Sequence, residues 1–146
     1  MAAYINTNTL EYPVFEGDIR LAFPNTSFPR QFAPPDGYAA VASAPRPDID
    51  HTQNVVEGAP AETSGSWAQT WVVTSASAQQ VADRTDAKAK SVRSERNTLL
   101  RDCDWTQLAD SPVANKAAWV QYRQALRDIS SQAGFPWSVV WPVTPA

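Results

Sequence analysis

The sequence predicts an α+β protein, with a small β-rich unit over residues 1–75 and a helical unit over residues 76–146. Two observations carry this prediction. Eight of the twelve prolines lie before Ala61, and each proline removes a backbone donor and fixes φ, so long helices are not expected there. From Ala76 to Arg101 the chain has no Pro or Gly and is rich in Ala, Gln, Lys and Arg, which are strong helix formers.

The first unit is expected to consist of short strands and turns. Runs of β-branched and aromatic residues between Pro or Gly breaks indicate early strands at 4–10, 18–23 and 38–41. The segments 53–58 and 66–74, separated by small polar residues, predict a β-hairpin.

The second strand of that hairpin carries two of the six tryptophans. Side chains alternate along a strand, so Trp67, Gln69, Trp71 and Val73 are expected on one face. This face must pack against something, and we expect Trp67, Gln69 and Trp71 to contact a partner protein.

The second unit is expected to begin with a long connecting helix. Ser77 followed by Gln80 fits a capping box at its start. Apolar residues gather only near its C-terminal end, at Val92, Leu99 and Leu100, followed by Cys103. The early half of this helix is therefore expected to connect the two units or to face a partner.

A second helix is predicted to complete a helical hairpin. Ser111 suits its N-cap and Pro112 its first helical position, and Gly134 marks its end. Within it, four apolar residues recur at three- and four-residue spacing, the stripe of a helix packed on another helix; they are Trp119, Tyr122, Leu126 and Ile129.

The apolar tail after Gly134, residues 135–142, cannot continue a helix and should fold back over the hairpin. It brings Trp137 and Trp141. Trp105, Trp119 and Trp141 are interpreted as core residues, whereas Trp137 and Trp67 are equally suited to the core and to contact with a partner.

Charge and cysteine content narrow the function. The net charge is −3 and no block of Lys and Arg occurs, so nucleic acid is not expected as a partner. Three Arg face eight Asp and Glu up to Ser75, and nine Lys and Arg face seven Asp and Glu beyond it. One Cys excludes an internal disulfide, and neither a signal peptide nor a long apolar span appears, which predicts a cytoplasmic protein without membrane insertion.

Reaction chemistry is not expected. The chain shows no glycine-rich phosphate loop and no clustered metal ligands, so no cofactor or metal is predicted. Cys103 with His51, oriented by Asp50 or Asp104, can be written as a nucleophile pair, but a buried Cys and a loop His explain the same residues. The protein is therefore predicted not to be an enzyme.

Two groups of charged residues can each be interpreted in two ways. Asp102, Asp104 and Asp110 could act in acid/base chemistry or bind a divalent cation, but we expect Asp104 and Asp110 to bond turn amides between the helices. The other cluster consists of Arg123, Arg127 and Asp128. It could bind an anion, but its residues are expected to be ion-paired on a helix face.

The stretch from 96 to 145 resembles the domain of bacteriophage tail (fibre) assembly chaperones. In that family an Asp-Trp-Thr-Gln-Leu turn precedes a helix with Trp and Tyr-Arg-x-x-Leu-Arg-Asp, and Gly-Phe-Pro and Trp-Pro close the domain. The matching residues here are Asp104, Trp105, Thr106, Gln107, Leu108, Trp119, Tyr122, Arg123, Leu126, Arg127 and Asp128, with Gly134 to Pro136, Trp141 and Pro142. The sequence departs from the family at Ser130, where a proline is common.

The resemblance implies a small non-enzymatic helper that binds the phage tail fibre protein, a trimeric partner, in the host cytoplasm during assembly. An alternative is a virion structural component that stays at the fibre tip on the tail and contributes to binding the host receptor. Homo-oligomerisation is left open. Within this hypothesis, Trp67, Gln69, Trp71 and Trp137 are the residues expected to touch the partner.

Overall fold

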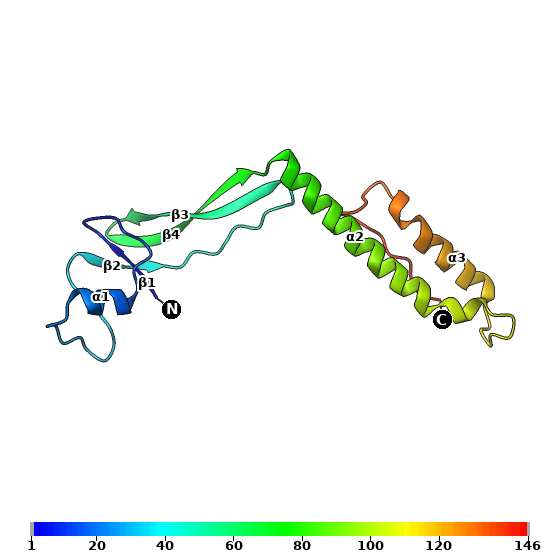
Figure 1. Ribbon diagram of the computed structural model, residues 1–146, viewed down its shortest axis with the longest axis horizontal. Helices are drawn as coiled ribbons and strands as arrows, with labels where there is room; N and C mark the ends of the chain where they lie inside the picture. The colour runs from blue at the N-terminus through cyan, green and yellow to red at the C-terminus, as the bar shows by residue number, and fades with distance from the viewer. Residues whose placement is uncertain (1, 146) are drawn as a thin grey trace. The chain divides into compact units, whose positions relative to one another are not determined.

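The computed structural model describes residues 2–145 and divides the chain into two compact units, with the boundary between Ser75 and Ala76. Figure 1 shows a sheet in the first unit and helices in the second. The predicted α+β class is confirmed. The first unit contains β1 (Ala3–Asn6), α1 (Glu16–Ala22), β2 (Tyr38–Ala42), β3 (Gln53–Thr63) and β4 (Ser66–Ser75). The second contains α2 (Ala78–Asp102), η1 (Asp104–Gln107), α3 (Lys116–Arg127) and η2 (Asp128–Ser131).

The sheet of the first unit is mixed, with the strand order β1-β2-β4-β3. β1 pairs antiparallel with β2, and β3 pairs antiparallel with β4, which confirms the predicted hairpin. Its turn residues Ser64 and Gly65 both have positive φ, the geometry of a two-residue hairpin turn that matches the strand twist. β2 and β4 are parallel, joined through Val41 opposite Trp67 and Ala42 opposite Ala68. β3 therefore lies at an edge of the sheet.

The predicted strand over residues 18–23 is wrong, because this segment lies mostly in helix α1 (Figure 1). Alternation would place Ile19 and Leu21 on one face, yet Ile19 is fully buried and Leu21 is 81% exposed. The Asp18 carboxylate accepts a hydrogen bond from the Phe15 amide at 2.9 Å, and Glu16 pairs with Arg20 one turn later at 2.7 Å. These local polar contacts favour a helix.

The core of the first unit lies between α1, β1 and the loop that follows α1. Its buried members are Tyr4, Val14 and Ile19. Four partly buried aromatic residues pack against them, namely Phe23, Phe28, Phe32 and Tyr38. Their rings meet mainly edge to face, as between Tyr4 and Phe32, whose centroids lie 5.3 Å apart. The predicted early strands at 4–10 and 38–41 correspond to β1 and β2, although β1 ends at Asn6.

Helix α2 begins as predicted. Ser77 is its N-cap: the Gln80 amide donates to the Ser77 hydroxyl at 3.2 Å, and the Ser77 amide donates to the Gln80 side chain at 2.9 Å. This reciprocal pair satisfies two of the amides that the first turn of a helix leaves without partners. Among the described residues, no helix is both long and apolar enough to span a membrane.

The predicted start of the second helix is wrong by about one turn. Helix α3 begins at Lys116, with Asn115 rather than Ser111 as N-cap; the Asn115 side chain accepts from the Ala118 amide at 3.1 Å. Asn is a strong N-cap residue. The Lys116 ammonium group also donates to the carbonyls of Leu108 and Ala109, at 3.0 and 3.1 Å, which ties the connecting loop to the new helix start.

The core of the second unit lies between α2, α3 and the tail, and the predicted apolar stripe faces it. Its buried residues are Val92, Cys103, Tyr122, Leu126 and Ile129. Leu99, Leu100, Trp119, Phe135, Val139 and Trp141 pack against them. The tail thus folds back over the hairpin, as predicted. Gln132 fixes it with two 2.8 Å hydrogen bonds, accepting from the Val140 amide and donating to the Val140 carbonyl.

Candidate functional site

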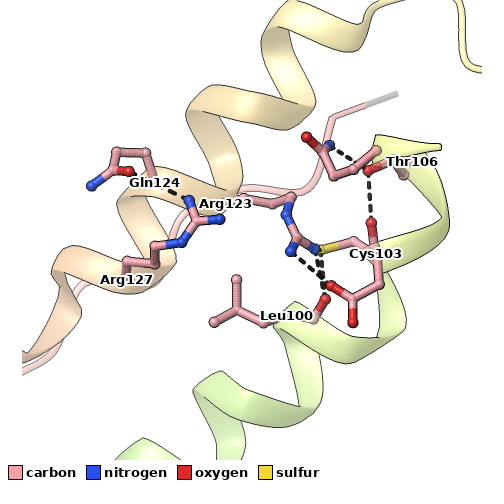
Figure 2. Close-up of polar contacts among 8 residues, drawn as sticks. Leu100, Cys103, Thr106, Arg123, Gln124 and Arg127 are labelled. Atoms are coloured by element: carbon pink, nitrogen blue, oxygen red, sulfur yellow. Dashed lines mark hydrogen bonds and ion pairs between the residues drawn. The ribbon is translucent and has the colours of Figure 1, made fainter. Parts of the chain in front are cut away.

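The turn that joins α2 to the loop before α3 is organised by one arginine. Arg123 is only 8% exposed, and its guanidinium donates to the Leu100 carbonyl at 2.7 Å and to the Cys103 sulfur at 3.0 Å. Its second terminal nitrogen donates to the Asp104 carboxylate at 2.7 Å. Figure 2 shows the Arg123 side chain reaching from α3 toward Leu100 and Cys103. One side chain therefore links the end of α2, the start of η1 and the middle of α3.

The charge of this arginine is balanced locally. Burial lowers the pKa of Arg123, but its hydrogen bonds to Asp104 and Cys103 raise the pKa by more, so it ends above its ordinary value. Asp104 supplies the carboxylate among these partners, and the Asp104 side chain remains 63% exposed. The expectation that Asp104 bonds turn amides is corrected: its partner is Arg123, because a forked guanidinium offers a carboxylate stronger, charge-assisted hydrogen bonds.

The middle of the turn is fixed by Thr106, which is fully buried. Its hydroxyl donates to the Cys103 carbonyl at 2.7 Å and accepts from the Gln107 side-chain amide at 2.8 Å. Figure 2 shows Thr106 and Cys103 bonded within the same turn. These contacts fix the start of the turn, and the hydrogen bonds from Lys116 to the Leu108 and Ala109 carbonyls fix its end.

Two apolar side chains of the same turn point outward. Trp105 is 48% exposed and Leu108 is 57% exposed. They lie three residues apart: Trp105 is in η1, and Leu108 is its C-cap, whose amide donates to the Trp105 carbonyl at 3.3 Å. The prediction that Trp105 is a core residue is wrong, because Thr106 takes the buried position of this turn. The Trp105 ring instead packs against Trp119, with the two ring centroids 6.3 Å apart.

The remaining motif residues, on α3, η2 and the tail, pack against the core or make local polar contacts. Trp119 and Trp141 are half-buried against the core, as predicted. Asp128 accepts from the Gln124 side chain at 3.0 Å, and Arg127 donates to the same side chain at 3.4 Å (Figure 2 shows the latter pair). The expectation of ion pairs on the helix face is wrong: Arg127 and Asp128 contact Gln124 instead, and the buried Arg123 pairs with Asp104 across the turn, because its position on α3 faces the end of α2.

The Trp-bearing face of β4 contacts its own chain. Trp71 donates its indole N–H to the Ala44 carbonyl at 3.1 Å, and Gln69 accepts from the Ala44 amide at 3.2 Å. Arg46 lies over the Trp71 ring, 5.9 Å from its centroid. Trp67 is half-buried beside β2. The contact with the segment after β2 was not foreseen; the sequence signal available was the extended Pro45-Arg46-Pro47 run.

A second polar pair flanks the same face. Tyr12 donates its phenol O–H to the Glu57 carboxylate. Burial, together with this hydrogen bond and the charge of Glu57, raises the pKa of Tyr12 to about 12. The same bond, with one from Gln69, lowers the pKa of Glu57. The pair joins the loop after β1 to strand β3.

Trp137 lies on the tail of the second unit and is 41% exposed. Its indole N–H donates to the Thr85 hydroxyl of α2 at 3.4 Å. The nearby Phe135 ring receives the Arg93 guanidinium, 5.2 Å from the ring centroid. Trp137 is thus anchored through its nitrogen while part of its ring reaches solvent.

Cys103, His51 and Asp50, the residues considered for catalysis, lie in the core, in a turn and in a loop. Cys103 is buried in the core of the second unit, and His51 lies in the turn before β3 in the first. Asp50 accepts from the amide and hydroxyl of Thr52, which lowers the pKa of Asp50. Among residues 2–145, no group of three or more His, Cys, Asp or Glu side chains is placed to hold a metal ion.

Residues 89–146 match the model of a family described as phage tail assembly chaperone protein. The match begins within α2 and includes η1, the turn with Trp105 and Leu108, α3 and the tail, so it extends a little beyond the range 96–145 inferred from motifs. The first 88 residues lie outside it. No curated protein and no solved structure matches the chain.

Proposed function

We propose that this chain is a phage tail assembly chaperone that binds the tail fibre protein stoichiometrically and promotes its folding, trimerisation or attachment. The observation that carries the proposal is the family match over residues 89–146, because it contains the turn whose backbone is fixed from both ends while Trp105 and Leu108 stay exposed. Large apolar side chains displayed on a fixed backbone are typical of protein-binding surfaces.

The first unit supplies a second surface suited to such a partner. Strand β3 spans eleven residues and lies at the sheet edge. Fibre subunits expose unpaired strands before they trimerise, and such edges promote aggregation. A strand edge can bind an extended segment through backbone hydrogen bonds. We therefore assign the unit up to Ser75 to partner binding through the edge of β3. Trp67, Gln69 and Trp71 lie one strand inward, on β4, and are proposed to contact the partner through their half-buried side chains, with Trp137 as a separate contact on the second unit.

The proposed mode of action is binding without chemistry. The chaperone would cover apolar and strand-edge surface of the fibre in the host cytoplasm during assembly, and the binding free energy would favour the assembly-competent state over aggregates. A stoichiometric helper of this kind needs no nucleotide cycle. The gain in soluble fibre protein should therefore increase in proportion to the amount of chaperone.

Coexpression tests the proposal. The full chain is produced together with the tail fibre protein encoded in the same genome, and soluble trimeric fibre is measured by size-exclusion chromatography with light scattering. We expect more soluble trimer and copurification of the chain with the fibre. Unchanged fibre yield without copurification would contradict the proposal.

The chaperone role and the alternative of a retained tip component differ in the finished particle. Mass spectrometry of purified particles measures this chain against the fibre. A chaperone released after assembly is expected to fall far below stoichiometric amounts. Copies equal in number to the fibre subunits would favour a virion component that contributes to host receptor binding.

A further inference from the structure

The turn that displays Trp105 and Leu108 is locally acidic. Residues 102–110 contain three Asp and no Lys or Arg, whereas the chain beyond Ser75 carries nine Lys and Arg against seven Asp and Glu. The side chains of Asp102 and Asp104 are 62% and 63% exposed, and Asp110 is exposed as well. The negative charge of the turn is therefore accessible from solvent.

The cations near this turn leave much of that charge uncovered. Arg123 is buried and contacts one oxygen of Asp104. Lys116 is engaged with two backbone carbonyls. Arg101 approaches Asp102 only to 3.8 Å and is itself 74% exposed, which is a weak surface pair. A partner that brings its own cations would meet carboxylates able to accept further hydrogen bonds.

We infer that the turn over residues 102–110, with its exposed Trp105 and Leu108 and the exposed carboxylates of Asp102 and Asp110, binds a basic segment of the tail fibre protein. An Arg or Lys of that segment would lie over the Trp105 ring, where the cation meets the negative face of the indole, and would pair with a neighbouring carboxylate. An apolar neighbour would cover Leu108. This inference rests on the proposed function and names the surface and the chemistry of the partner segment.

The turn is prepared for such a contact before the partner arrives. Arg123 and the buried Thr106 fix the backbone on both sides of Trp105, and Trp119 supports one side of the indole ring. Binding therefore requires little ordering of the turn, and less free energy is lost on association. An aromatic residue on a rigid support is the usual centre of a protein interface.

The apolar arm of the test compares full-length variants in binding to the purified fibre protein by calorimetry. Trp105→Ala and Leu108→Ala are each expected to weaken binding by roughly tenfold or more. Val143→Ala, which truncates an exposed apolar side chain in the tail of the second unit, is the control and should leave affinity within about twofold. Circular dichroism and thermal unfolding confirm that each variant keeps the fold.

The charge arm tests the nature of the partner segment. The double variant Asp102→Asn, Asp110→Asn should weaken binding by about fivefold or more at low salt and reduce its dependence on salt concentration, because fewer ion pairs are screened. The control is Asp86→Asn, Glu95→Gln, which removes two exposed charges of α2. That variant should bind like the unmodified chain.

The outcomes separate the two claims. Failure of the unmodified chain to bind the fibre contradicts the proposed function. If the unmodified chain binds, full affinity in Trp105→Ala and Leu108→Ala overturns the inference, while the function stands. Loss of affinity in the apolar variants with unchanged affinity and salt dependence in the charge variant overturns the basic nature of the segment.

Discussion

At the scale of single residues, the structure of the second unit depends most on Arg123. The sequence places this residue beside the apolar stripe of α3 and predicts that it is ion-paired on the helix face. In the fold it caps the end of α2 through the Leu100 carbonyl and also binds Cys103 and Asp104. Basic side chains near a helix C-terminus satisfy free carbonyls and suit the helix dipole. Here the arginine comes from the neighbouring helix.

Replacing Arg123 should destabilise the second unit. Arg123→Ala leaves the half-buried Leu100 carbonyl and the buried Cys103 without this donor and opens space in the core, so we expect a loss of about 2–3 kcal/mol in the free energy of unfolding. Arg123→Lys keeps the charge but not the fork, so it should restore only part of that loss. The measurement is urea unfolding followed by circular dichroism at the helix band.

Arg127→Ala is the matched control for this prediction. Arg127 lies one turn further along α3, is exposed, and makes a single 3.4 Å contact with Gln124. Its replacement should change stability by less than about 0.5 kcal/mol. Equal effects at the two positions would show that the buried contacts of Arg123 do not stabilise the turn.

At the scale of elements, local sequence signals predicted some helices and strands correctly and others wrongly. The capping box at Ser77 and the hairpin of β3 and β4 follow from short-range chemistry and were predicted. The segment 18–23 was expected to be a strand but lies mostly in α1. Ile19 and Phe23, which pack in the core of the first unit, are four residues apart, and this spacing also fits one face of a short helix. The acidic first turn of α1 favoured the helix.

The N-cap of α2 gives a prediction at this scale. Ser77→Ala removes the side-chain acceptor for the Gln80 amide, and the second unit should lose about 1 kcal/mol of unfolding free energy. Ser94→Ala, at an exposed position inside the same helix, is the control and should be neutral or slightly stabilising because Ala is the better helix former. The urea midpoints of the two variants are compared. A shared midpoint would argue against the cap.

At the scale of the whole molecule, each unit has its own set of buried residues. The first is centred on Tyr4, Val14 and Ile19, and the second on the residues between α2, α3 and the tail. The contacts divide between Ser75 and Ala76. We propose that the two units are separate domains, the first for partner binding and the second similar to tail assembly chaperones.

If the units are separate domains, residues 76–146 should fold without residues 1–75. The fragment contains the complete core of the second unit, the capping box of α2 and the Arg123 contacts. We expect helical circular dichroism and one cooperative thermal transition, which small single domains normally show. A fragment that lacks a cooperative transition, while the full chain has one, would contradict two independent domains.

The sequence by itself determined the fold class, the hairpin, the start of α2, the stripe of Tyr122, Leu126 and Ile129, and the return of the tail. These features follow from turn residues, caps and periodicity, which act over a few positions. The tertiary structure alone decided that Thr106 is buried while Trp105 faces solvent, and that Asp104 pairs with Arg123. Those outcomes depend on where the end of α2 meets α3, and no short-range pattern encodes contacts between residues nineteen positions apart.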